Sequence, residues 1–397
     1  MLKRFNSLSI VISLFLSGLL LNGCQTTTDN ENNKLSYKAL RSTVSVNFSP
    51  DNRLWRLIPT EQAIYVDFSE DFGQSYSKAV RVNKLDQKIS AWPENPPAIE
   101  ISQSGRIYVL YYADEEQKST SFLSYSDDNG QTFSTPSLVS DHAQTDMHYM
   151  DKMLIDTEDK LYLFWHDTRH DSHEKQQAVG TLSLYYSTKN SSDNSPFKNT
   201  FINNGICSCC RTAAAFDNKG NPVIFARMVY DNGVRDHALM RIEENGEWKI
   251  PQRATYDEWN VEACPEHGPA ITINENNRTH LTWFTLGEKR EGIFYAQTDD
   301  FGKTVSEPIS LGNSNLLPGH PDIISLDQRV VIVWKEFDGE QTVLHSKESS
   351  DQGKTWIEKP TGLTSRTNNS HPALITNKTN IYISWTAEDT GHVVLKI

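Results

Sequence analysis

The chain has 397 residues, a formal net charge of −13, 37% hydrophobic residues and 22% charged residues. This length is ample for a large hydrophobic core. The acidic balance, without any run of basic residues, argues against nucleic acid and anionic lipid surfaces as partners. The sequence leaves the oligomeric state open.

The first 23 residues are predicted to be a targeting segment outside the fold. Lys3 and Arg4 form a basic start, a mostly apolar run covers residues 8–21, and the run ends at Leu21-Asn22-Gly23-Cys24. Such a short run is typical of a signal peptide and too short for a stable membrane span. The Leu-x-Gly-Cys ending resembles a bacterial lipobox, which implies cleavage before Cys24 and lipidation of its thiol. An ordinary signal peptide with a chance cysteine is the alternative.

The lipobox resemblance implies a cell-envelope lipoprotein that touches the membrane only through its lipid anchor. Gln25 follows the cysteine in place of an aspartate. By the sorting rules of bacterial lipoproteins, this favours the outer membrane over the inner membrane. The polar residues 24–34 are predicted to form a flexible tether. Residues 35–397 are then expected to form one folded body.

Four short stretches share the frame S/T-x-D-x-G-x-S/T followed by an aromatic residue, with Val305 as the one exception at the last position. An Asp side chain can accept hydrogen bonds from backbone amides just ahead of it, and glycine adopts a positive φ angle without steric cost. Each copy lies between apolar runs and therefore predicts a tight turn between two strands. The structural pairs are Asp71 and Gly73, Asp128 and Gly130, Asp300 and Gly302, and Asp351 and Gly353.

These stretches resemble the Asp-boxes, or BNR repeats, of the sialidase-like β-propellers. The resemblance implies an all-β fold, a single propeller of four-stranded antiparallel blades, and it implies chemistry only weakly. A second repeat pairs a short apolar strand with a strand rich in Tyr and Trp, and its copies begin at residues 44, 97, 151, 212, 269, 321 and 372. This spacing predicts seven blades, with six as the alternative.

The last blade has room for only three strands after Pro372. A strand from about residues 35–40 is expected to supply the missing outer strand and to close the ring, which would remove an exposed sheet edge. The turn frame is degraded in the third blade, within residues 187–197, and replaced by Asn245-Gly246-Glu247-Trp248 in the fourth. Function is expected where the copies differ.

In a propeller, the residues just before each innermost strand face the central channel, at the end opposite the Asp-boxes. Two cysteine-containing segments hold such positions in neighbouring blades, Cys207-Ser208-Cys209-Cys210 and Cys264-Pro265-Glu266-His267. Equivalent positions in the next two blades hold His320 and His371. These side chains are therefore expected to lie close together at the channel mouth.

Thiols and imidazoles are typical ligands of Cu(I) and zinc. The sequence thus predicts a metal site for metal handling or redox chemistry, with copper as the first expectation and zinc as the alternative. Its candidate ligands are Cys207, Cys209, Cys210, Cys264, His267, His320 and His371. Disulfide bonding is the competing interpretation, because the four cysteines other than Cys24 are an even number in an oxidising compartment.

A run of His and acidic residues over 166–173, together with His142 and His148, also belongs to the third blade. A solvated polar loop is the favoured interpretation, and a metal or substrate contact is the alternative.

A sialidase-like glycoside hydrolase is the second functional hypothesis, with Arg211, Glu336 and Glu388 as candidate catalytic residues. Sialidases carry an Arg-Ile-Pro motif, and the nearest match is Arg56-Leu57-Ile58-Pro59, which has one residue inserted. The pattern therefore departs from that of sialidases. The third hypothesis is a non-catalytic surface scaffold, and each hypothesis places a small-molecule, glycan or protein ligand at the channel mouth.

Overall fold

The computed structural model describes residues 43–397 except 116–117, 142–147, 170–180, 194 and 244. In this part of the chain the regular elements are β-strands, and the helical elements are two single 3-10 turns, η1 (Asp231–Gly233) and η2 (Ser314–Leu316). Neither turn approaches the length and apolarity needed to cross a membrane. The prediction of an all-β fold is confirmed. The predicted signal peptide, tether and closing strand lie outside the described residues.

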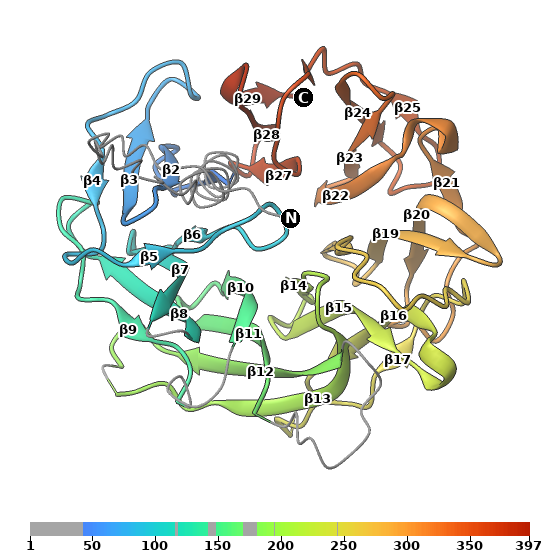
Figure 1. The fold of residues 1–397 in the computed structure, drawn as a ribbon, viewed down its shortest axis with the longest axis horizontal. Coiled ribbons are helices and arrows are strands. Elements are labelled where there is room, and N and C mark those ends of the chain that lie inside the picture. The colour runs from blue at the N-terminus through green and yellow to red at the C-terminus, as the bar shows by residue number, and fades with distance from the viewer. Residues whose placement is uncertain (1–42, 116–117, 142–147, 170–180, 194, 244) are drawn as a thin grey trace, which may run out of the picture. The chain divides into compact units, whose positions relative to one another are not determined.

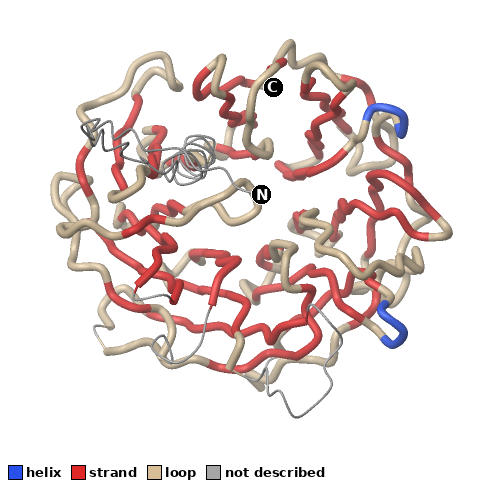
Figure 2. Tube along the Cα trace, viewed as in Figure 1, coloured by secondary structure: helices blue, strands red, loops and turns tan. Residues whose placement is uncertain are grey.

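The strands are arranged as a ring of antiparallel sheets, which we number as blades in chain order (Figures 1 and 2). The first three blades consist of β1 (Ser45–Phe48), β2 (Leu54–Pro59), β3 (Ile64–Ser69) and β4 (Val80–Arg81); β5 (Lys88–Ile89), β6 (Ala98–Ile101), β7 (Ile107–Glu115), β8 (Lys118–Ser126) and β9 (Ser137–Leu138); and β10 (His148–Ile155), β11 (Leu161–Asp167), β12 (Thr181–Lys189) and β13 (Thr200–Cys207).

The remaining blades follow the same pattern, and β13 also pairs with β15 of the fourth blade. They consist of β14 (Ala213–Phe216), β15 (Pro222–Val229), β16 (Arg235–Arg241) and β17 (Gln252–Arg253); β18 (Ala270–Ile273), β19 (Thr279–Gly287), β20 (Arg290–Thr298) and β21 (Ile309–Leu311); β22 (Gly319–Leu326), β23 (Arg329–Phe337), β24 (Thr342–Ser349), β25 (Ile357–Glu358) and β26 (Thr364–Ser365); and β27 (Ala373–Thr376), β28 (Ile381–Ala387) and β29 (Gly391–Lys396).

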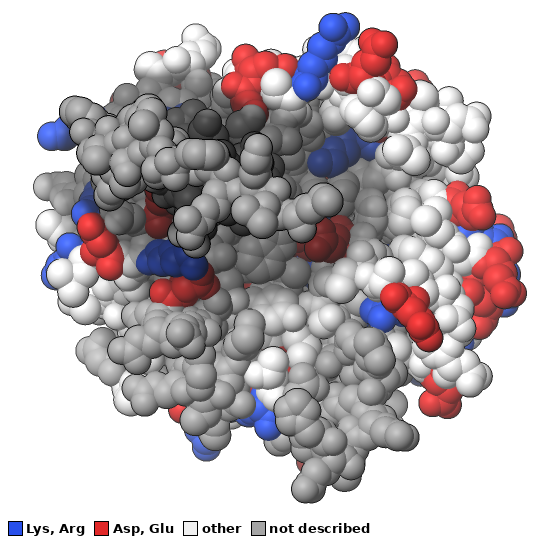
Figure 3. Space-filling model, in the orientation of Figure 1, with Lys and Arg blue, Asp and Glu red and all other residues white. Residues whose placement is uncertain are grey.

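The innermost strands of neighbouring blades contact one another around the centre of the ring. In chain order these strands are β1, β6, β10, β14, β18, β22 and β27, and β27 in turn contacts β1. This closed cycle favours the seven-blade prediction over six. Charged side chains of both signs are interspersed on the face drawn in Figure 3, without a continuous basic area among the described residues.

The core consists of separate apolar layers between neighbouring blades. On β11, Leu161, Leu163 and Trp165 pack with side chains of the second blade, including Tyr108. The alternate residues Tyr162 and Phe164 pack toward the fourth blade. Because side chains alternate between the two faces of a strand, a strand buried on both faces must be apolar at nearly every position. Each blade is therefore held by its neighbours rather than by a core of its own.

The four Asp-box turns share one hydrogen-bonding pattern. In each, an Asp Oδ1 atom accepts from the backbone N–H four residues later, over 2.8 Å in the first turn and 2.9 Å in the other three. The second carboxylate oxygen accepts from the hydroxyl of that same residue. The box glycines have φ angles between 74° and 92°. The turn is thus closed by its own side chains, with glycine where a left-handed backbone is needed.

Candidate functional site

Three histidine side chains lie face to face where the innermost strands of blades five, six and seven begin. The ring centroids of His267 and His320 are 4.2 Å apart, and those of His320 and His371 are 3.5 Å apart. Phe284 of β19 stacks on the other side of His267, with ring centroids 3.9 Å apart. We call His267, His320 and His371 the histidine stack. Equivalent positions of the repeat thus do bring these three imidazoles together.

The backbone around His320 is shaped to present its ring. The pairing of β22 with β23 shifts register between Gly319 and Asp322, and His320 within this bulge has a φ of 52°. Bulges commonly redirect a side chain, and a left-handed backbone is unusual for a residue other than glycine. A Cβ atom on Gly319 would lie 2.8 Å from Cε1 of His267. The absence of a side chain at Gly319 therefore lets the His267 ring approach.

Glu94 lies beside the stack, on the connection between β5 and β6 that extends toward the middle of the ring (Figure 1). Its side chain is 2% exposed and accepts four hydrogen bonds. Oε2 accepts from His371 Nε2 at 3.2 Å and from Arg211 Nη1 at 2.8 Å. Oε1 accepts from the backbone N–H of Arg211 at 3.0 Å and of Gly268 at 2.5 Å. Glu94 therefore joins the second, fourth, fifth and seventh blades.

The charges around the stack follow from these contacts. Burial alone would raise the pKa of Glu94, but the Arg211 charge and the His371 hydrogen bond outweigh it and lower that pKa to about 2. Burial lowers the pKa of His267 to about 4 and of His371 to about 3, and it holds the pKa of His320 well below its ordinary value. Glu94 is therefore an anion at neutral pH, and the three imidazoles are neutral.

The neutral imidazoles each keep one ring nitrogen without a partner. The Nδ1 atoms of His267, His320 and His371 are buried and have no hydrogen-bond partner among the described residues. Lys335 also lies near the stack, and burial followed by the Arg211 charge lowers its pKa to about 8. Its Nζ donates to Asn369 Oδ1 at 3.3 Å. The stack therefore places three unpartnered ring nitrogens beside a partly buried cation.

Two cavities meet this group of residues. His371, Glu94 and Arg211 line a cavity of 440 Å³ along the innermost strands. His267, His320 and Lys335 line a second cavity of 340 Å³. Ligand atoms therefore have room on both sides of the histidine stack.

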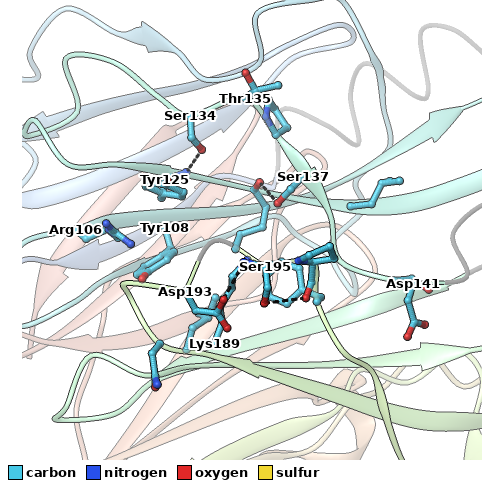
Figure 4. Close-up of a pocket in the computed structure, with 18 residues that line it drawn as sticks. Arg106, Tyr108, Tyr125, Ser134, Thr135, Ser137, Asp141, Lys189, Asp193 and Ser195 are labelled. Atoms are coloured by element: carbon cyan, nitrogen blue, oxygen red, sulfur yellow. Dashed lines mark hydrogen bonds between the residues drawn. The ribbon is translucent and has the colours of Figure 1, made fainter.

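A larger cavity of 680 Å³ lies elsewhere, between blades two and three (Figure 4). Two of its polar groups already have partners: Arg106 forms an ion pair with Asp127, and the Ser134 hydroxyl accepts from the backbone N–H of Tyr125. Size alone therefore does not identify the functional site, and the perturbed groups described above do not line this cavity.

Three cysteines form a second, sulfur-rich group at the end of β13. The Sγ atom of Cys207 lies 3.9 Å from that of Cys209 and 3.7 Å from that of Cys210. All three side chains are buried, and all four described cysteines are free thiols. Cys264 is exposed and does not belong to this group. We call Cys207, Cys209 and Cys210 the thiol cluster.

Two arginines hold positive charge beside the thiol cluster. Arg235 Nη1 donates to Cys207 Sγ at 3.0 Å. Arg227 is 1% exposed and donates to the carbonyl oxygens of Arg235, His267 and Phe284. None of the described carboxylates forms an ion pair with Arg227. Hydrogen bonds shared with the other two thiols, together with the charges of both arginines, hold the pKa of Cys207 well below its ordinary value.

The structure divides the predicted ligand set instead of assembling it into one site. The ligand atoms of Cys207, Cys209 and Cys210 lie within 4.8 Å of one another, and those of Glu94, His320 and His371 form a separate group with the same limit. A backbone turn holds the cysteines together, whereas the histidines come from separate blades. Cys264 and His267 stand outside both groups.

The third-blade residues also differ from the expected solvated loop. His148, His166 and Asp167 are fully buried in β10 and β11. Asp167 accepts from Trp165 Nε1 at 2.9 Å and pairs with Arg169. For these three residues the loop interpretation was wrong, because both strands extend further than their apolar runs. His142, His170 and His173 lie outside the described residues.

The candidate residues for glycoside hydrolysis lie in different surroundings. Arg211 is paired with Glu94. Glu336 is buried and accepts from Trp334 Nε1 at 2.8 Å and from the backbone N–H of Asn313 at 2.9 Å, which is a structural role. Glu388 accepts a 3.4 Å hydrogen bond from Asn368 Nδ2. Arg56 is paired with Asp67 on the neighbouring strand, at 2.7 Å.

Comparison with known proteins bears on the fold. No protein-family model matches the sequence, and no curated protein is similar to it. Among solved structures, a Hadza microbial sialidase, Hz136, is similar over 88% of this chain and 75% of its own, with 12% identity and a TM-score of 0.51. The polysaccharide lyase Uly1 is similar over 89% of both chains, with 11% identity and a TM-score of 0.54.

A protein of unknown function from Dyadobacter fermentans is similar over 76% of this chain and 94% of its own, with 13% identity and a TM-score of 0.52. This chain is a β-propeller. Its propeller fold is shared with proteins named for different reactions, so the fold alone does not determine what the site does.

Several residues of the site were not found from the sequence. Glu94 directly precedes Asn95-Pro96, which the repeat places at the channel end, so the alignment of blades offered a signal for it. Arg227 and Arg235 lie within and at the start of strands, where no repeat position distinguishes them. His166 lay in the run interpreted as a loop, yet it is close enough to Cys207 and Glu94 for both to act on its pKa, which burial lowers to about 4.

Proposed function

We propose that the thiol cluster binds one copper(I) ion and that the protein handles copper in the cell envelope. The observation that carries this proposal is the set of three mutually close sulfur atoms beside two buried or partly buried guanidinium groups. Three thiolates with one Cu(I) ion carry a charge of about −2, and Arg227 with Arg235 carries about +2. The arginines thus compensate a metal–thiolate complex that would otherwise be costly to bury.

Copper(I) fits this cluster better than zinc. Soft thiolates select Cu(I), whereas structural zinc sites are almost always tetrahedral with four protein ligands. The cluster supplies three sulfur atoms, and the exposed Cys264 does not complete it. Zinc is therefore the alternative outcome of the test rather than the proposal.

The test is an anaerobic titration of the reduced, purified protein with Cu(I) in the presence of a chromophoric competitor. We expect one tightly bound equivalent, which Cys207→Ser should remove. Cys264→Ser is the matched control and should keep it, because Cys264 is exposed and outside the cluster. The proposal fails if no stoichiometric copper binds, or if the Cys207→Ser and Cys264→Ser variants bind it equally.

We also propose that Cys24 carries a lipid anchor and that residues 24–34 tether the propeller to the outer membrane. The support is the Leu21-Asn22-Gly23-Cys24 sequence after a short apolar run, followed by Gln25. Wild-type protein expressed in a bacterial host should fractionate with outer membranes, and Cys24→Ser should shift it to the soluble envelope fraction. Equal distribution of both forms would contradict the anchor.

A carbohydrate-directed activity in the 440 Å³ cavity is a second candidate function. Glu100 and Asp151 line this cavity, and burial raises the pKa of each carboxyl to about 7. A carboxyl with such a pKa can donate a proton at neutral pH, as glycoside cleavage requires. Turnover of a panel of fluorogenic glycosides, lost in Asp151→Asn but kept in Glu388→Gln, would support it. Inactivity across the panel would leave a binding scaffold as the remaining hypothesis.

A further inference from the structure

Lys335 is a partly buried positive charge that lacks a negative partner. Its Nζ donates to Asn369 Oδ1 at 3.3 Å and to the carbonyl oxygen of Ser370 at 3.4 Å, and both hydrogen bonds are long. None of the described carboxylates forms an ion pair with it. Glu94 acts on Lys335 electrostatically, but Glu94 is already paired with Arg211. Because burying an unpaired charge is costly, an anion beside Lys335 would stabilise this part of the protein.

The 340 Å³ cavity next to Lys335 has no negative charge in its wall. Among the described residues that line it there is no aspartate or glutamate, although the chain has 51 acidic and 38 basic residues. Its neutral polar side chains are those of Thr342, Thr367, Asn368 and Asn369. A negatively charged ligand in this cavity would therefore be attracted by Lys335 without being repelled by the wall.

The histidine stack supplies hydrogen-bond donors to the same cavity. The rings of His267 and His320 line it, and burial keeps both imidazoles neutral by holding their pKa values below the ordinary range. A neutral imidazole carries one N–H group. The Nδ1 atoms of both rings are buried without a partner, which leaves Nε2 as the ring nitrogen that can contact a ligand. With its proton on Nε2, each ring offers a donor without adding charge.

Leu317 and Phe337 form the apolar part of the cavity wall, and they are 70% and 41% exposed. The loop that carries Leu317 is anchored to β23, because Glu336 Oε1 accepts from the backbone N–H of Asn313 at 2.9 Å. Leu317 has a φ of 44°, a left-handed conformation that is unusual for a residue other than glycine and that occurs preferentially at ligand-binding sites. The fold thus holds an apolar side chain in solvent beside a cation.

We infer that the 340 Å³ cavity binds a small organic carboxylate. Lys335 supplies the opposite charge, and His267 and His320 donate N–H groups to the carboxylate oxygens. Leu317 and Phe337 contact the apolar part of the ligand. One ammonium group among neutral imidazoles balances a single negative charge, so a monocarboxylate fits better than a phosphate dianion. The site shares no lining residue with the 440 Å³ cavity and depends on neither copper(I) binding nor glycoside cleavage.

Butyrate is the probe for the main experiment, a calorimetric titration of the reduced full chain at pH 7 in buffer without chloride or phosphate. We expect one saturable site, and no measurable binding of butyramide, which has the same shape without the charge. Butyrate should bind about 10-fold more tightly than acetate, because its two additional methylene groups contact the apolar wall. The inference is overturned if butyrate does not saturate a site, if butyramide binds equally well, or if inorganic phosphate binds more tightly than butyrate.

A pair of lysine variants in the sixth blade tests the opposite charge. Lys335→Met should weaken butyrate binding about 10- to 100-fold, because it removes a hydrogen bond between two charged groups. Lys347→Met is the matched control and should bind butyrate like the wild type. Lys347 lies on β24, 3.9 Å from Glu358, and does not line the cavity. Equal butyrate affinity in the two folded variants would contradict the inference.

The wild-type chain provides a second measurement if Lys335→Met does not fold. Burial lowers the pKa of Lys335 to about 8, so about half of the free protein carries this charge at pH 8. A bound carboxylate favours the charged form, so butyrate binding should take up close to half a proton at pH 8 and almost none at pH 6.

The other groups near Lys335 do not contribute to this proton uptake. Arg211 stays charged, Glu94 stays ionised and the three imidazoles of the histidine stack stay neutral between pH 6 and pH 8. Calorimetry in two buffers with different ionisation enthalpies measures the proton uptake. Butyrate binding without proton uptake at pH 8 would show that Lys335 is not the group that meets the carboxylate.

Discussion

At the scale of single residues, one buried carboxylate organises the channel mouth. Glu94 accepts hydrogen bonds from residues of the fourth, fifth and seventh blades, and one of these, Arg211, neutralises its charge. Removing one partner of a buried ion pair leaves an uncompensated charge, which is strongly destabilising. Glu94 therefore stabilises the ring and also orients His371. A substitution of Glu94 would affect both properties at once.

His148 provides a pH-dependent prediction away from the histidine stack. It is fully buried, its Nε2 accepts from the backbone N–H of Ser121 at 2.8 Å, and burial lowers its pKa to about 4. The unfolded chain takes up a proton near pH 6.5, well before the folded one does. The contribution of neutral His148 to the unfolding free energy is therefore fully present above about pH 6.5 and is lost as the pH falls toward 4.

We expect this residue alone to reduce the unfolding free energy by about 2 kcal/mol between pH 7 and pH 5. Urea unfolding at both pH values should show a smaller loss in His148→Gln than in the wild-type chain. His345→Gln is the control, because His345 is partly exposed, and it should behave like the wild type. Identical pH dependence in all three proteins would contradict the assignment.

The repeat allowed the positions of the three histidines to be predicted, but not the residues that surround them. His267, His320 and His371 occupy equivalent positions, so the blade spacing placed them at one end of the ring. The partner of Glu94, Arg211, is 117 residues away, and no local pattern joins them. The sequence also predicted one site for the cysteines and the histidines, whereas the structure has two groups. Equivalent positions in neighbouring blades do not determine the direction in which each side chain points.

At the scale of elements, the Asp-box turns also connect neighbouring blades. The glycine of each box packs on a side chain of the preceding blade among the described residues. These contacts are Gly73 with Val394, Gly130 with Trp55, Gly302 with Leu239, and Gly353 with Tyr295. The turn pattern was predictable because it is local, whereas this packing role depends on residues of another blade.

A pair of glycine variants separates backbone strain from this packing. Gly130 has a φ of 74°, and a Cβ atom there would lie 2.7 Å from Trp55. Gly105 has a φ of 90°, and nothing lies within 4 Å of its Cβ position. Gly105→Ala should therefore lower the unfolding free energy only by the strain of alanine in a left-handed backbone conformation, about 1 kcal/mol.

Gly130→Ala should cost about 1–3 kcal/mol more than Gly105→Ala, because the side chain of Trp55 must move. Urea denaturation followed by circular dichroism measures both values. Equal costs would show that the box glycine is required by its φ angle alone and not by contact with the neighbouring blade.

At the scale of the whole molecule, the ring depends on the seam between its last and first blades. Tyr382 of β28 is 3% exposed, lies 5.0 Å from Phe48 of β1 between ring centroids, and stacks on Phe72 at 5.6 Å. Tyr76 of the first blade also contacts His392 of β29, at 3.3 Å. Because each blade is held by its neighbours, opening this seam would expose two blade faces at once.

Truncating Tyr382 should therefore destabilise the entire ring. We expect Tyr382→Ala to lower the unfolding free energy by about 3–5 kcal/mol, as for other large buried aromatic side chains. Tyr65→Ala, on β3 of the first blade, is the control and should cost less, because Tyr65 is only partly buried. If the blades unfold as one unit, the urea midpoint falls while the slope of the transition is unchanged. A separate early transition in Tyr382→Ala would instead show that a terminal blade detaches while the rest of the ring persists.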